Sequence, residues 1–187
     1  MPTLPNFARP ASRALVTAAL LLVGSTIRLN AQTAGFEVLG YRTTVPATWE
    51  SRAPSSSMRV AEFVLPSEGG ERAEVVVYFF GAGQGGSPEA NIERWRSQFS
   101  APAGASVYEA IMTLTDAPFP TTVAEWRGSY ARGVGTGPES GAARPNHTLV
   151  SVIVQAPRGS IFVQLFGPSP RVSVARDELL QAIRGLK

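Results

Sequence analysis

Short segments in which apolar and polar residues alternate dominate the chain after residue 31. Alternation with a period of two is typical of strands that bury one face. The pattern predicts strands at 41–46, 58–65, 73–80, 107–114, 121–130, 148–155 and 160–166. Segment 73–80 is the most apolar and is expected near the centre of a sheet, and the last two segments are expected to form a hairpin.

Two further segments carry apolar residues at helical spacing instead. The first opens with Ser87, Pro88 and Glu89, which is a favourable N-terminus because serine caps, proline fits the first helical position and an acid complements the dipole. Its expected apolar face consists of Ile92, Trp95 and Phe99. The second helix is expected over 171–186, with an apolar stripe of Ala175, Leu179, Ile183 and Leu186. Together these elements predict an α+β domain, a largely antiparallel sheet of about six or seven strands flanked by two helices.

The first 31 residues have the pattern of a cleavable signal peptide. Arg9 and Arg13 precede an apolar run at 14–24, and Ala31 supplies the small residue expected before the cut. A membrane anchor is the alternative, but the run is about half of the roughly 20 residues that a membrane span needs. We therefore expect export to the periplasm or the extracellular space, no stable membrane insertion after cleavage, and one domain at 32–187.

The signal peptide changes the meaning of the basic composition. The formal net charge is +3, but Arg9, Arg13 and Arg28 lie in the first 31 residues, which contain no acid. Residues 32–187 therefore keep 14 of the 17 basic residues against 14 acidic residues, and their formal charge is zero. This balance argues against a nucleic-acid partner. The chain also contains no cysteine, and a domain of this length does not need disulfides to bury a core.

A glycine-rich loop at 81–86 is the motif that most resembles a ligand site. Gly81, Gly83 and Gly86 match the G-x-G-x-x-G spacing between a predicted strand and a predicted helix. The nearest acid at a strand end, Asp116, lies 30 residues beyond Gly86, whereas a dinucleotide site needs one after about 20. The spacing therefore favours a loop that requires unusual backbone angles, and no cofactor is predicted.

An anion site at the start of the helix remains as an alternative reading of this loop. Free backbone amides at a helix N-terminus bind carboxylate or sulfate, and two arginines follow nearby. The candidate ligand-binding residues are Gly83, Gly85, Gly86, Ser87, Arg94 and Arg96.

Candidate catalytic chemistry is sparse. His147 is the single histidine, and its place beside a glycine- and proline-rich segment at 131–146 predicts a solvated side chain. One histidine without cysteine makes a metal site or a catalytic triad unexpected. Segment 131–146 is predicted to be flexible and is a second candidate for partner contacts.

The order of elements resembles that of a known fold. The motifs "VPATW" at 45–49 and "FVQLFGP" at 162–168, followed by a closing helix, resemble the PsbP-type fold of photosystem II extrinsic subunits, their cyanobacterial relatives and a nuclear Ran-binding protein. Residues 58–99 also resemble uncharacterised exported proteins of environmental Gram-negative bacteria. The first resemblance implies a sheet sandwiched by helices and an accessory or docking role.

These observations rank three hypotheses for the function. The first is an exported non-enzymatic accessory domain that docks to a protein or cell-envelope partner through the glycine loop or segment 131–146. The second is a small-ligand or anion-binding module at Gly81 to Glu89. A hydrolase is third, because the sequence does not place a nucleophile, a base and an orienting group together.

Overall fold

The computed structural model describes residues 34–131 and 143–187, which belong to one compact unit, Ala31–Lys187. The predicted signal peptide and most of segment 131–146 lie outside the described residues. The elements are β1 Gly35–Val38, β2 Tyr41–Thr44, β3 Glu50–Arg52, β4 Arg59–Val64, β5 Glu74–Tyr78, α1 Pro88–Arg96, β6 Phe99–Ser100, β7 Tyr108–Thr113, β8 Thr121–Tyr130, β9 Arg144–Ala156, β10 Gly159–Pro168 and α2 Ser169–Arg184. Neither helix is long and apolar enough to cross a membrane.

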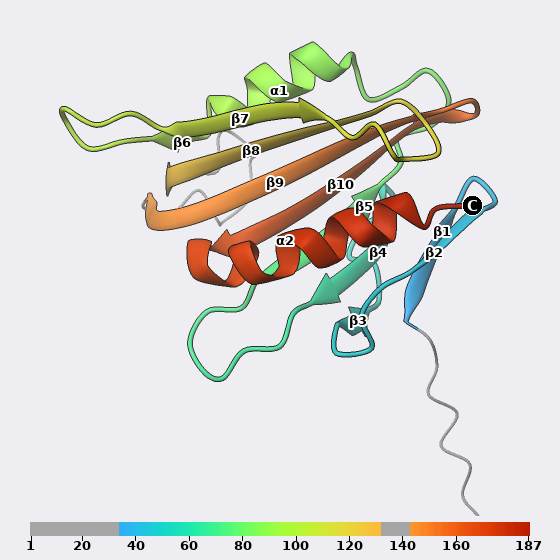
Figure 1. The fold of residues 1–187 in the computed structure, drawn as a ribbon, viewed down its shortest axis with the longest axis horizontal. Helices are drawn as coiled ribbons and strands as arrows, with labels where there is room; N and C mark the ends of the chain where they lie inside the picture. Colours follow the sequence, from blue (N-terminus) through green and yellow to red (C-terminus); the bar gives the residue numbers. More distant parts are fainter. Residues whose placement is uncertain (1–33, 132–142) are drawn as a thin grey trace, which may run out of the picture. The chain divides into compact units, whose positions relative to one another are not determined.

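Eight strands form one antiparallel sheet, and the expected α+β class is confirmed. The strand order is β3-β4-β5-β10-β9-β8-β6, and β7 pairs with β8 on the same side as β6 (Figure 1). The expected hairpin joins β9 to β10, with Ala156 opposite Gly159. Strand β5 lies inside the sheet between β4 and β10, but β10 occupies the middle of the strand order.

The two faces of this sheet carry separate apolar clusters. On β10, Ile161, Val163 and Leu165 pack with α2, whereas Phe162 packs with Trp95 of α1. Consecutive residues of a strand point to opposite faces, so the two helices cover opposite faces of the sheet. We call these the α2 face and the α1 face. Figure 1 shows α2 lying along the strands of the α2 face.

Helix α1 is shorter than the apolar spacing predicts. It begins as expected, with the Ser87 hydroxyl accepting the Ala90 N–H at 3.2 Å, but it ends at Arg96. Phe99 lies in β6 opposite Tyr130, so its assignment to the helix was wrong. Phe99 is nevertheless buried in the same cluster as Trp95. Spacing alone does not distinguish a buried helical residue from a buried residue just beyond the helix.

Helix α2 is held to the sheet by its predicted stripe and by one polar link. Ala175, Leu179 and Ile183 are buried in the α2-face cluster, as expected. Beside them, the Arg176 guanidinium lies 3.0 Å from the carboxylate of Glu125, a largely buried residue of β8. Removal of one partner of such a buried pair is costly because the other charge stays desolvated.

The first predicted strand lies outside the main sheet. β2 pairs with β1 in a separate two-stranded sheet, beside the C-terminus in Figure 1. The Arg42 N–H donates to the Lys187 carbonyl at 2.8 Å, and the Lys187 N–H donates to the Arg42 carbonyl at 3.0 Å.

The predicted flexible segment 131–146 is shorter than expected at its C-terminal end, because residues 144–146 already belong to β9.

Candidate functional site

The predicted ligand loop lies between β5 and α1, and its glycines have the expected unusual angles. Gly83, Gly85 and Gly86 all have φ between 69° and 95°. Ser87 caps the helix, and the pKa of Glu89 is lowered by a hydrogen bond from its own N–H and another from the Ser87 hydroxyl. Side chains of the protein itself therefore already serve as acceptors at the start of α1.

The two predicted arginines lie in the last turn of α1, away from Ser87 at its first turn. Arg94 donates to the Asn91 side-chain oxygen at 2.6 Å, and Arg96 lies 3.0 Å from the Glu109 carboxylate of β7. The structure therefore gathers the glycines and Ser87 at one end of α1 and the two arginines at the other. An anion site at this loop stays a prediction.

Asn91, which sequence reasoning overlooked, organises the glycine loop. Its amide donates to the carbonyls of Gly85 at 2.6 Å and Ser87 at 2.9 Å, and the residue is 3 % exposed. The signal available in the sequence was a polar residue one position before the apolar face of the helix. Its contacts show that the loop is fixed by the fold itself.

His147 is buried, so the expectation of a solvated side chain was wrong. β9 begins three residues earlier, and its alternation turns the imidazole onto Phe166, with ring centroids 5.3 Å apart. Nδ1 lies 2.9 Å from the Pro145 carbonyl and Nε2 lies 3.2 Å from the Glu71 carboxylate. Both ring nitrogens thus contact acceptors of the fold rather than a hydroxyl nucleophile.

Among the residues that the structure describes, no three His, Cys, Asp or Glu side chains are grouped so that they could hold a metal ion. The polar side chains buried in the sheet include Thr148, whose hydroxyl donates to that of Ser169 at 2.8 Å. This pair joins β9 to the start of α2. Its contacts serve to position the helix.

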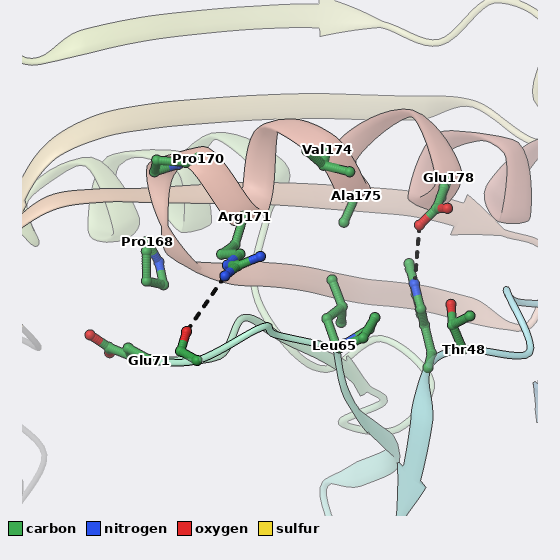
Figure 2. Close-up of a pocket in the computed structure, with 12 residues that line it drawn as sticks. Thr48, Leu65, Glu71, Pro168, Pro170, Arg171, Val174, Ala175 and Glu178 are labelled. Carbon is green, nitrogen blue, oxygen red and sulfur yellow. Dashed lines mark hydrogen bonds between the residues drawn. The ribbon is translucent and has the colours of Figure 1, made fainter.

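The structure shows a different candidate site, a groove between α2 and the segment that connects β4 to β5. Its volume is about 620 Å³, within the range of about 300–1,000 Å³ that ligand sites occupy. Figure 2 shows side chains of α2 on one side and those of the connecting segment on the other. The lining residues are Thr48, Trp49, Leu65, Pro66, Gly69, Glu71, Pro168, Pro170, Arg171, Val174, Ala175 and Glu178.

Helical spacing brings three of these residues to the groove. Arg171, Val174 and Glu178 follow one another at intervals of three and four residues, so they share a face of α2 beside the core stripe. Val174 is 78 % exposed. Leu65 lies between the two charged residues, whereas Pro168 and Pro170 lie beyond Arg171 (Figure 2).

Arg171 and Glu178 stand at opposite ends of the groove, and Glu71, which is paired with Arg144 at 3.0 Å, also lines the Arg171 end. Arg171 stands in the first turn of α2, which has no acid and no side-chain cap, so the positive end of the helix dipole adds to the guanidinium charge. The guanidinium also contacts the Gly69 carbonyl at 3.5 Å. At the other end, the Glu178 carboxylate accepts the Trp49 indole N–H at 3.2 Å, and the dashed line at Glu178 in Figure 2 marks this bond.

The sequence contained part of the signal for this groove. A helix that opens with a cationic residue and no acid, and that carries an aliphatic residue off its core stripe, has features that core packing does not explain. The opposite wall, however, comes from Leu65 to Glu71, about a hundred residues earlier in the chain. Only the fold places that wall against α2.

Comparisons with known proteins identify no family for this chain. No family model matches the chain. No curated protein matches it either. Among solved structures, the chain is similar to the crystal structure of a Pseudomonas aeruginosa protein of unknown function that has been suggested to be a regulator. The two share 14 % sequence identity, with a TM-score of 0.44, over 82 % of this chain and 95 % of that one.

Proposed function

We propose that this chain is an exported, non-enzymatic accessory domain that docks to a cell-envelope protein by binding a short extended peptide segment in the α2 groove. The observation that carries the proposal is the groove itself, in which an apolar surface separates Arg171 from Glu178. The expected signal peptide and the resemblance to PsbP-type docking proteins support the location and the class of function.

The dimensions of the groove favour a peptide of about three residues. Arg171 and Glu178 are seven helical positions apart, which corresponds to about 10 Å along the axis. Three residues of an extended chain cover about the same length. Val174 and Leu65 between the two charges suit an apolar central side chain.

Charge complementarity sets the direction of the bound segment. A terminal carboxylate would be stabilised beside Arg171, where guanidinium and helix dipole act together. A lysine or arginine side chain, or an amino terminus, would be stabilised beside Glu178. The segment therefore ends in its carboxyl group at the start of α2 and carries a cation about three residues before that end.

A peptide-binding experiment tests this proposal. Random tetrapeptide pools with free carboxyl ends, and the same pools with amidated ends, are titrated into the protein while isothermal titration calorimetry measures the affinity. We expect the free-acid pool to bind more tightly. Arg171→Ala should weaken that binding by about tenfold or more, because a charge-assisted hydrogen bond is worth about 1.5–3 kcal/mol.

Arg158→Ala is the matched control, because Arg158 is an exposed arginine that donates to the Leu39 carbonyl and does not line the groove. It should leave peptide affinity unchanged. Equal binding of free and amidated pools, or equal affinities of the Arg171 and Arg158 variants, would contradict the proposal.

A further inference from the structure

The two edges of the main sheet differ in how well they are protected against a further strand. β3 forms one edge with only three residues, two of which are charged, and Pro54 follows two positions later. Glu50 also pairs with Arg72 at 3.2 Å. Short length, charged side chains and a nearby proline are the usual means by which an edge avoids pairing with another chain.

The opposite edge, where β7 lies on the same side of β8 as the short β6, is less protected. Strand β7 is six residues long, pairs with β8 in a register without a bulge, and contains neither proline nor lysine. Ile111 is 51 % exposed and Met112 is 42 % exposed. Its one charged residue, Glu109, is turned onto the α1 face, where its carboxylate accepts the Trp126 indole N–H at 2.7 Å.

The register of β7 shows which backbone groups are available. The Leu114 N–H donates to the Thr121 carbonyl of β8 at 2.9 Å. Alternate residues of an antiparallel strand bond to the same neighbour, so Met112 and Ala110 also direct their backbone groups to β8. The N–H and C=O groups of Glu109, Ile111 and Thr113 therefore point outward, and no strand among the described residues pairs with them.

We propose that β7 pairs antiparallel with β7 of a second copy of this chain, around a two-fold axis at Ile111. Ile111 then lies opposite Ile111 of the second copy, and Glu109 lies opposite Thr113 in both halves. In this register, Glu109, Ile111 and Thr113 each pair with a residue of β7 in the second copy. A register centred on Glu109 would oppose two carboxylates, and one centred on Thr113 would leave Glu109 beyond the partner strand.

Three features of the chain favour a second copy over another partner. The Ile111 register is self-complementary, as a two-fold interface requires. Residues 32–187 have zero formal charge, so two copies experience no net repulsion. The protected β3 edge also stops growth, so assembly ends at a dimer that carries a continuous sheet. This proposal does not depend on the peptide groove.

Sedimentation velocity over a wide range of protein concentration tests the proposal. The chain is expressed from its full-length sequence, and mass spectrometry establishes the N-terminus of the purified product. We expect a concentration-dependent dimer for the wild type and a monomer for Ile111→Lys, because two lysines would then oppose each other at the axis. Val174→Lys, which adds the same charge on exposed α2, should remain dimeric.

A single-cysteine variant supplies an independent measurement, since the chain has no cysteine of its own. Opposed residues at this position lie about 5.5 Å apart between Cα atoms, which is within disulfide range. Ile111→Cys should form a covalent dimer on mild oxidation, whereas Ser51→Cys on β3 should not. A monomeric wild type, a dimer that survives Ile111→Lys, or open-ended assembly overturns the proposal. If peptides do not bind while the dimer is intact, only the proposal of peptide binding in the α2 groove is overturned.

Discussion

At the scale of single residues, the glycine loop is explained by sterics more readily than by ligand chemistry. Gly85 has φ of +95°, and a Cβ atom there would meet Phe162 at 2.7 Å and Phe80 at 3.0 Å. Gly83 has φ of +69°, and a Cβ atom there would meet nothing within 4 Å. Position 85 therefore requires glycine because of its positive φ and its close packing, whereas position 83 requires glycine because of its positive φ alone.

Gly85→Ala should consequently destabilise the fold more than Gly83→Ala. The positive φ costs each variant about 1–2 kcal/mol, and the contact with buried Phe162 adds about 1–3 kcal/mol at position 85 only. Urea unfolding followed by far-ultraviolet circular dichroism measures both free energies. Equal losses in the two variants would show that the loop moves away from Phe162 at little cost, contrary to this expectation.

At the scale of elements, the connection between β3 and β4 is tied by one carboxylate. Glu62 of β4 accepts the Ser55 N–H at 2.6 Å and the Ser55 hydroxyl at 2.8 Å, and it lies 3.3 Å from Arg59. Burial raises the pKa of Glu62, but the hydrogen bonds from Ser55 and the attraction of Arg59 outweigh it. The net result is a pKa below the ordinary value of 4.5.

This shift predicts a stabilisation that depends on pH. A carboxyl group with a lowered pKa in the folded state stabilises the fold above its unfolded pKa, and this contribution is lost as the pH falls through the folded value. Glu62→Gln should therefore be less stable than the wild type at neutral pH, and the difference should shrink below pH 4.5. Glu37→Gln, at an exposed ion pair with Arg42, is the control. A difference that stays constant with pH would contradict the assignment.

Element prediction from the sequence succeeded mostly where burial imposed a pattern, although the exposed strand β7 was also expected. The strands β4, β5, β7, β8, β9 and β10 and both helices were expected near their observed positions. β1, β3 and β6 were missed because segments of two to four residues are too short for a period to be visible. The groove was missed for another reason, since Arg171 and Val174 meet their opposite wall only after α2 has packed on the sheet.

At the scale of the whole molecule, the two apolar clusters share their supporting strands. Trp49 lies in the cluster of the α2 face, whereas Trp95 and Trp126 lie in that of the α1 face. Strands β8, β9 and β10 contribute side chains to both clusters in alternation. Unfolding of these strands would therefore disrupt both apolar clusters together. We expect the described domain to unfold as one cooperative unit.

A mutation on one face should accordingly be detected by a reporter on the other. In a Trp49→Phe background, the remaining tryptophan fluorescence reports the α1 face alone. Leu179→Ala, a fully buried position of the α2 face, should cost about 2–5 kcal/mol and shift this fluorescence transition to lower urea by the same amount as the circular dichroism transition. Val174→Ala, exposed on the same helix, should shift neither. A fluorescence midpoint that stays in place while circular dichroism becomes biphasic would mean that the faces unfold separately, so that the shared strands do not couple them.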